Sequence, residues 1–528
     1  MKTSTKLIRK NLIFLLFFCA ITFAQTIDYI EVESLPVYDT DEDYWGPYDY
    51  RWAYKIANSL HISSKQATLR RFLPFTEGDS LAPELIEEAQ RRLRSTDFIG
   101  EAQIELIETD SGNVALVRVR DLWTTKLSPT FSYRGRVIEW SVEAEEVNLI
   151  GYGINIAGSF RHDEDYNSWY GKLSLPKILP GQTNIRISHS NATETIGPRG
   201  TALSITKKRN RDSDKLIIEA GAACTGGIIQ TYSDDNKSEE KFRIDDQKFE
   251  SGIEFIHLKK YGFGFGLSSI RSERILEENS QLYFDNDLEV ATLGFSYLDR
   301  NYYTTTDVDA FGRTEDIFEG YRISIESGIG PESESPYHYA GLALSQKIGF
   351  FHPTVSVWYK RLNKIEYYSA SMRFFTDKVL WSRICGRFFW ARVSNAAPDV
   401  YYRVGGQSYL RTYRSYKQVG ENILCCNLES RTFTSLEIAS IRFGAVLFAD
   451  FATAWDNPHG YYPMDDSRKP IIGDYGIEIR LASTSSTTGQ ILRLSLARSL
   501  DGELWQFELA SGQLFRSILN FDHRVPLP

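Results

Sequence analysis

Acidic residues near the N-terminal end are spaced like those of a calcium-binding loop. Asp39, Asp41 and Asp43 stand two residues apart, as do the first ligands of an EF-hand. That loop also needs a glycine at its sixth position and a bidentate glutamate at its twelfth. This sequence has Tyr44 and Tyr50 at those positions. We therefore expect no calcium site here.

The other patterns that could carry chemistry are also incomplete. The eight histidines form no HExxH motif, and no cysteines and histidines stand at zinc spacing. Gly151-Tyr152-Gly153 is not followed by a helical pattern, which a dinucleotide fingerprint requires. The sequence contains no Gly-x-Ser-x-Gly elbow. We expect no enzyme, no catalytic residues, and no metal or other cofactor.

The first 24 residues are typical of a secretory signal peptide. Lys2, Lys6, Arg9 and Lys10 form a positive segment, and an apolar core follows over residues 12–23. Small residues precede a cleavage site that we expect after Ala24. About a dozen apolar residues are too few to cross a bilayer, so we predict export rather than a membrane anchor.

The composition excludes helical membrane spans but allows a transmembrane barrel. The chain after the signal has no run of 18 apolar residues, and the mean hydropathy is -0.32. Barrel strands alternate lipid-facing and lumen-facing side chains, so their mean hydropathy is polar. Aromatic residues make up 13% of the chain, and Tyr and Trp favour membrane interfaces. The net charge of -9, with no basic stripe, argues against nucleic acid as a partner.

Residues 25–122 mix strand and helix periods. A first strand is predicted around Ile27–Val32, followed by a short helix at residues 67–72. Ser80 is predicted to cap a second helix, with Leu85, Ala89 and Leu93 on one face. Two alternating strands, at residues 102–106 and 114–119, complete a β-α-α-β-β order.

From residue 123 to 515 the helical period is absent and residues alternate with period two. In residues 261–267, Tyr261, Phe263, Phe265 and Leu267 share one face and glycines occupy the other. A soluble β-sandwich would also alternate, but the number of strands and the large outward aromatics favour a barrel. At roughly 25 residues per strand, this length predicts about 16 antiparallel strands. The fold class is thus an all-β transmembrane barrel preceded by a small α+β domain.

The order of these parts resembles the BamA/TamA outer-membrane assembly superfamily, whose barrels follow periplasmic POTRA domains. The motifs of residues 69–72, 77–79, 89–99 and 117–124 look like a single POTRA domain. Residues 146–153, Glu-Val-Asn-Leu-Ile-Gly-Tyr-Gly, resemble the family's Asn-Leu-x-Gly-x-Gly segment.

The most specific motifs of this resemblance lie near the C-terminus. Residues 405–413 resemble the family's inward-folded extracellular loop, whose arginine would be Arg411 and whose aromatic would be Tyr413. The resemblance implies that Arg411 lies inside the barrel and meets Glu429, Phe448 and Asp450. The family has glycines where this chain has Thr412 and Ala452.

The resemblance implies a protein of the Gram-negative-type outer membrane, with its POTRA domain in the periplasm, that inserts or translocates other proteins. The partners expected are outer-membrane lipids, unfolded or exported client proteins, and accessory periplasmic or lipoprotein subunits. The alternatives are a two-partner secretion pore for one dedicated substrate and a structural or passive barrel. The sequence alone does not choose between them.

The same resemblance predicts a lateral gate between the first strand, around residues 127–133, and the last, around residues 504–515. Gly512 is expected to kink the last strand, and Phe515 resembles the closing aromatic of such barrels. Residues 516–528 continue beyond it as a C-terminal extension with no predicted role.

Overall fold

The computed structural model describes residues 26–40, 51–110, 112–134, 137–162, 167–179, 183–192, 197–207, 215–232, 239–258, 260–278, 280–331, 337–395, 400–405, 409–413, 417–456, 471–487 and 491–512. The expected signal peptide, residues 41–50 of the acidic motif, Phe515 and the C-terminal extension lie outside these residues.

The N-terminal unit is a three-stranded sheet covered by helices. Strand β3 (Gly112–Asp121) lies between β1 (Tyr29–Leu35), to which it is parallel, and β2 (Ile99–Thr109), to which it is antiparallel. Three helices connect β1 to β2, namely α2 (Arg51–Leu60), α3 (Gln66–Arg70) and α4 (Pro83–Arg94). The sequence reading missed α2, so the observed order is β-α-α-α-β-β. Naming this unit a POTRA domain stays a prediction.

Helix α4 packs on the sheet through the face that the sequence predicts. Ala89 and Leu93 are fully buried, and Leu85 packs against the same core. Ser80 does not cap this helix, because it forms a β-bridge with Thr26, and the residue at the cap position is Ala82. Pro83 occupies the first turn, where no amide hydrogen is required.

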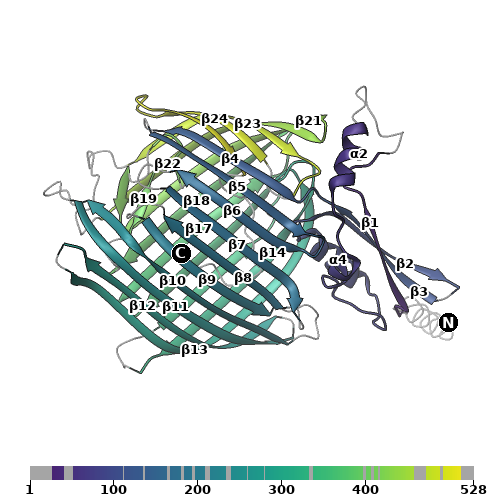
Figure 1. Ribbon diagram of the computed structural model, residues 1–528, viewed down its shortest axis with the longest axis horizontal. Coiled ribbons are helices and arrows are strands. Elements are labelled where there is room, and N and C mark those ends of the chain that lie inside the picture. Colours follow the sequence, from purple (N-terminus) through teal and green to yellow (C-terminus); the bar gives the residue numbers. More distant parts are fainter. Residues whose placement is uncertain are drawn as a thin grey trace, which may run out of the picture.

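The larger unit is a closed ring of twenty strands. Its wall consists of β4 (Thr125–Arg134), β5 (Val137–Leu149), β6 (Ile154–His162), β7 (Asn167–Leu179), β8 (Thr183–Ala192), β9 (Gly197–Lys207), β10 (Leu216–Tyr232), β11 (Glu239–His257), β12 (Tyr261–Leu276), β13 (Gln281–Thr306), β14 (Thr314–Ile329), β15 (Tyr337–Ser345), β16 (Phe351–Leu362), β17 (Ile365–Thr376), β18 (Ser382–Ser394), β21 (Asn422–Ile438), β22 (Ile441–Trp455), β23 (Ile472–Ser483), β24 (Ile491–Ser499) and β25 (Trp505–Ser511). The last strand, β25, pairs with the first, β4. Strands β9 and β10 lie side by side, which completes the barrel in Figure 1.

The prediction of about 16 strands was wrong. Twenty strands fit between Thr125 and Ser511, so each strand with its connection takes about 19 residues rather than 25. The turns at the end near the N-terminal unit are short, as at residues 439–440 and 377–381. Short connections such as these allow more strands in the same length of chain than the estimate assumed.

In the barrel wall, apolar side chains face outward and charged side chains face inward, which is the reverse of a sheet in a water-soluble protein. On β23, Ile477 and Ile479 are 53% and 51% exposed, whereas the intervening Glu478 and Arg480 are each 1% exposed. The predicted face of β12 follows the same rule, with Phe263 and Phe265 facing outward. Such an outer surface suits hydrocarbon, and the charged side chains of β23 face the interior. In the described part of the chain, no helix has the length and apolarity needed to cross a membrane.

The N-terminal unit is docked on one end of the barrel, as Figure 1 shows. Arg94 of α4 forms an ion pair with Asp316 of β14, with 2.6 Å between Nη2 and Oδ1. The guanidinium of Arg91 lies 4.2 Å from the ring centroid of Tyr302 on β13. Burial alone would raise the pKa of Glu88, but hydrogen bonds and charges from Arg91 and Arg92 outweigh it and hold this pKa at about 2. Glu88 therefore stays ionised and fixes Arg91 against the barrel.

A second attachment lies at the turn between β5 and β6. The amide of Lys65 and the hydroxyl of Thr68 both donate to the carbonyl of Gly151, at 2.9 and 3.0 Å. A Cβ at Gly151 would collide with the Ser63 carbonyl, and the residue has a φ of +78°. The segment resembling the family's Asn-Leu-x-Gly-x-Gly motif thus forms a turn that holds the N-terminal unit.

Candidate functional site in the barrel interior

The long segment between β18 and β21 folds into the barrel and carries Arg411 to its inner wall. Arg411, Thr412 and Tyr413 are all buried. Residues 406–408 and 414–416 of this segment lie outside the described residues. Two short strands, β19 (Tyr402–Val404) and β20 (Gln418–Gly420), pair with each other and form its base.

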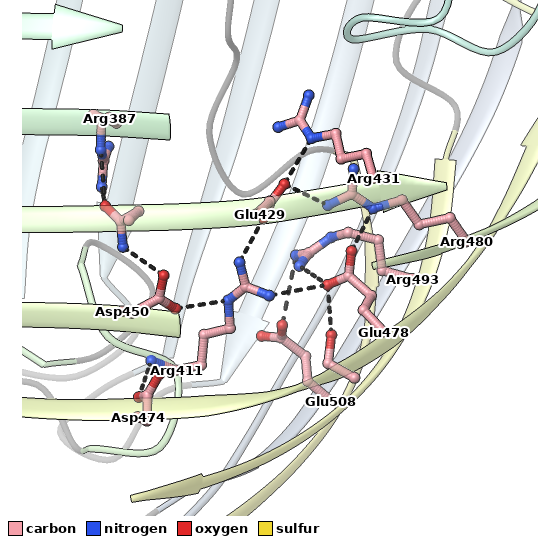
Figure 2. Close-up of polar contacts among 12 residues, drawn as sticks. Arg387, Arg411, Glu429, Arg431, Asp450, Asp474, Glu478, Arg480, Arg493 and Glu508 are labelled. Atoms are coloured by element: carbon pink, nitrogen blue, oxygen red, sulfur yellow. Dashed lines mark hydrogen bonds and ion pairs between the residues drawn. The ribbon is translucent and has the colours of Figure 1, made fainter. Parts of the chain in front are cut away.

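Arg411 is surrounded by three carboxylates and one aromatic ring. Its Nη2 donates to Oε1 of Glu429 at 2.6 Å, and its Nε lies 3.1 Å from Oδ2 of Asp450. Its Nη1 lies 3.5 Å from Oε2 of Glu478. Its guanidinium stacks 3.6 Å from the ring centroid of Phe448. Figure 2 shows the side chain pointing into this acidic group. A planar guanidinium fork suits such an arrangement, whereas an ammonium does not.

Strand register explains why these groups meet. Glu429 of β21 is the cross-strand partner of Phe448 of β22, and Asp450 of β22 is the partner of Asp474 of β23. Phe448 and Asp450 are two residues apart, so they face the same side of the wall. Three adjacent strands thus place an aromatic ring and several carboxylates on one patch of the interior.

A single carboxylate oxygen fixes the backbone of the loop. Oδ2 of Asp474 accepts hydrogen bonds from the amides of Arg411 and Thr412 at 2.7 and 2.8 Å, and from Thr412 Oγ1 at 2.9 Å. The hydroxyl of Tyr413 donates to the carbonyl of Gly473. The φ of Thr412 is not in the left-handed region, so a β-branched residue fits where the family has glycine. Its hydroxyl supplies a bond that glycine would lack.

The charged cluster continues along the inner wall to the last strand. Arg480 joins Glu478 to Glu429, and Arg493 of β24 bonds Glu478 at 3.1 Å. Arg493 also lies 3.5 Å from Glu508 of β25. These groups are almost completely buried. The network in Figure 2 therefore runs from β21 to β25, the strand that closes the barrel.

A second inward segment comes from the opposite end of the barrel. The turn of residues 307–313 connects β13 to β14, at the end that carries the N-terminal unit, and Val308 and Phe311 in it are buried. Arg431 of β21 donates to the Val308 carbonyl at 2.7 Å and to Asp309 Oδ1 at 2.9 Å. Strands β15 to β18 separate β14 from β21 along the wall. The turn therefore reaches across the interior of the ring.

The turn of residues 307–313 packs against a defined apolar site on the inner wall. The ring of Phe311 lies 4.8 Å from that of Phe433 and clusters with Ala482 and Ile491. Gly444 leaves the space for Phe311, because a Cβ there would overlap the Phe311 ring. Arg431 also bonds Glu429 at 2.7 Å. Glu429 therefore connects the loop from one end of the barrel with the turn from the other.

The structure brings together the five predicted residues of the inward loop and its wall, namely Arg411, Tyr413, Glu429, Phe448 and Asp450. Of the two residues predicted for the lateral gate, it describes Gly512. Gly512 directly follows β25, with a φ of +82°, and its amide donates to the Ile491 carbonyl at 2.7 Å. It ends the described strand rather than kinking its middle. Phe515 lies outside the described residues.

Sequence reasoning missed Asp474, Glu478, Arg480, Arg493 and Asp309. Two of these, Glu478 and Arg480, alternate with Ile477 and Ile479, so their inward direction followed from the strand period. Nothing in the local pattern of Asp309 shows that it reaches a strand on another part of the wall. In the part of the chain that the structure describes, no three His, Cys, Asp or Glu side chains are placed to hold a metal ion.

The chain is similar to solved structures rather than to a family model or a curated sequence. No family model matches the sequence, and no curated protein matches it. Among solved structures, BamA from Haemophilus ducreyi lacking POTRA domains 1–3 aligns at 13% identity, over 92% of this chain and 84% of that one, with a TM-score of 0.41. CdiB from Acinetobacter baumannii aligns at 10% identity, over 92% and 74%, with a TM-score of 0.45. CdiB from Escherichia coli aligns at 12% identity, over 92% and 76%, with a TM-score of 0.48.

These matches include BamA, which gives its name to the superfamily that the sequence motifs resemble. With identities of 10–13% and TM-scores below 0.5, they describe a likeness in fold.

The buried arginine yields a test of how the loop is held. Arg411→Ala leaves Glu429, Asp450 and Glu478 without their shared cation, and breaking a buried ion pair in this way costs about 3–5 kcal/mol. We expect a lower temperature for the heat-dependent shift of the folded barrel in gel electrophoresis. Arg411→Lys should recover only part of the loss, since lysine keeps the charge but not the fork.

Arg403→Ala is the matched control, because Arg403 belongs to the same inward segment but is exposed. It should leave the transition temperature unchanged. Equal transition temperatures for the two alanine variants would show that Arg411 does not hold the loop.

Proposed function

We propose that this chain is an outer-membrane barrel that assists the insertion or translocation of other proteins through a lateral seam between β4 and β25. The observation that carries this proposal is the shortness of that seam. Among the residues that the structure describes, four pairs join β25 to β4, from Gln506 opposite Arg134 to Leu509 opposite Phe131. Among the described residues, no other neighbours in the ring for which the pairing is resolved have fewer than seven.

Pro129 explains why the pairing stops where it does. The register would place Ser511 opposite Pro129, but proline has no amide hydrogen to donate. The Pro129 carbonyl instead accepts the Ser511 hydroxyl at 3.3 Å. A carbonyl and amide of one residue point to the same side of a strand, so the missing donor of Pro129 faces β25. Within a sheet, proline is found where the side of the strand that its nitrogen faces has no partner to pair with.

A short seam favours replacement of the β4–β25 pairing by a client strand, rather than an opening that stays empty. Unpaired backbone groups in hydrocarbon cost several kcal/mol each, so an empty open seam is unfavourable. A client strand that adds to the edge of β4 or β25 would replace the lost bonds. The free energy then comes from folding of the client, which suits a protein with no nucleotide-binding motif.

The occupied interior supports a lateral route over a central one. Barrels of 16–18 strands leave an aqueous channel, so a ring of twenty is too wide for side chains alone to close. Here the loop with Arg411 and the turn of residues 307–313 both cross the interior and bond the same wall. A substrate passing through the centre would have to displace both, whereas the seam opens without breaking either.

The main test is a quantitative proteome of isolated outer membranes with and without depletion of this protein. Loss of many unrelated barrels is the expected result. Loss of one surface or secreted protein would favour a two-partner secretion pore instead. An unchanged proteome, with the protein itself present and folded in that membrane, would leave only a structural or passive barrel.

The seam itself is tested by a cross-link. Tyr133 and Phe507 are opposite each other across β4 and β25, and both are exposed. Tyr133→Cys with Phe507→Cys, in a Cys224→Ser background that removes the exposed native thiol, should form a disulfide that reduces client insertion at least tenfold. Reduction should restore it.

The control for this cross-link uses the same first strand. Tyr133→Cys with Ile138→Cys joins β4 to β5, its other neighbour, at directly opposed positions. Insertion should continue in this variant. If the two cross-linked proteins insert clients equally well, the seam is not the route.

We further propose that the N-terminal unit receives clients in the periplasm at the free edge of β2. Among the described strands, β2 is at the edge of its sheet and pairs with β3 alone. An extended segment could add there through main-chain hydrogen bonds, which do not depend on sequence. Within the predicted segment of residues 102–108, Gln103 and Glu105 are exposed.

Photoreactive amino acids at Gln103 and Glu105 should cross-link to client chains during assembly. Glu87 is the control, because it is exposed on α4 and away from the sheet edge. Equal labelling from all three positions would contradict capture at β2.

A further inference from the structure

Helix α2 is amphipathic, but its apolar side faces outward. None of its residues is buried. Trp52, Ile56 and Leu60 are 69%, 53% and 70% exposed, and their spacing of four residues places them along one stripe. A helix on the surface of a water-soluble domain normally turns such a stripe toward the core.

The polar side of α2 is the one that packs on the protein. The ring of Tyr54 stacks on Tyr38 with 4.4 Å between centroids, and its hydroxyl is 2.9 Å from Ser440 Oγ. Asn58 exchanges two hydrogen bonds with the backbone of Tyr38, at 2.8 and 3.1 Å. His61, directly after the helix, bonds Asp121. These contacts fix the helix with its apolar stripe pointing away from the protein.

Helix α2 is attached, through Tyr54, to a part of the barrel rim that carries an apolar band of its own. Ser440, which α2 contacts, lies in the turn between β21 and β22. This turn and the turns of the neighbouring hairpins β17–β18 and β15–β16 expose large apolar side chains at the same end of the barrel. They are Ile348, Phe350, Val379, Leu380, Trp381, Leu436, Ile438 and Ile441.

We propose that α2 lies in the plane of the membrane interface, with Trp52, Ile56 and Leu60 inserted among the phospholipids of the leaflet that faces the N-terminal unit. Lipid is the occupant that fits, because α2 contacts the turn at Ser440, and the exposed apolar side chains around that turn continue those of the outer barrel wall. Tryptophan favours this interface. Lys55 is exposed beside the stripe, where its ammonium can reach phosphate while its stem stays apolar.

This anchor gives the N-terminal unit a second support besides its contacts with the barrel. One end of the unit is held by Arg94 and Asp316, and α2 holds another part against the bilayer. The inference rests on the proposed membrane location of the barrel, but not on its role in protein insertion.

The test measures the depth of a spin label in the full chain. Ile56→Cys in a Cys224→Ser background is labelled and reconstituted in vesicles of phosphatidylethanolamine and phosphatidylglycerol. Collision rates are measured with oxygen, which concentrates in lipid, and with a water-soluble nickel chelate. Gln103→Cys is the control, on an exposed polar position of the same unit. The Cys224→Ser parent corrects for labelling of the remaining thiols.

We expect the ratio of oxygen to nickel collisions at position 56 to exceed that at position 103 at least fivefold. Equal ratios, in a barrel that is folded in the vesicles, would place α2 in water and overturn the proposal. A label shielded from both reagents would show protein rather than lipid on the stripe, and would also overturn it. Neither result would alter the outcome of the depletion experiment, so the two proposals fail separately.

Discussion

The interior of this barrel is organised around one buried carboxylate, Glu429. It accepts bonds from Arg411, Arg431 and Arg480, which belong respectively to the inward loop, to its own strand and to β23. Removing charges from water is costly, and only close pairing offsets that cost. The three guanidinium groups and their further carboxylates therefore hold one another in place. The positions of the loop and of the turn of residues 307–313 both depend on this arrangement.

A wide ring makes such an arrangement necessary. The outer face of the wall is apolar, so the charges of alternating strands such as β23 must all face inward. In a smaller barrel the side chains themselves would fill the space. Twenty strands leave room that backbone segments have to occupy, and these segments need fixed partners on the wall. The packing of Phe311 against Gly444 fixes the turn to the wall, and the bonds of Asp474 to Thr412 fix the loop.

The sequence predicted well the features that follow from helix or strand periodicity. It predicted poorly those that depend on contacts between residues far apart in the chain. Alternation in β12 and β23 and the helical face of α4 follow from neighbouring residues, and the structure has them as expected. The group around Arg411 could be named only through its resemblance to a family. Helix α2 was missed, although Trp52, Ile56 and Leu60 recur at helical spacing. The strand count was wrong because turn lengths are not encoded in the alternation. The contact of Arg431 with Asp309 joins residues 122 positions apart, and no local pattern signals it.

The pairing of β4 with β25 also bears on how the molecule itself forms. These strands are the first and last of the ring, so their contact closes the longest loop in the chain, and loop closure becomes more costly as length increases. Among the described residues, four pairs between these strands offset that cost. Contacts of such high sequence separation form late in folding. Until they form, the nascent sheet has two open edges, which hydrocarbon cannot solvate. Pairing of β25 with β4 removes both of these edges in one step, so that each of these strands has a neighbour on both sides.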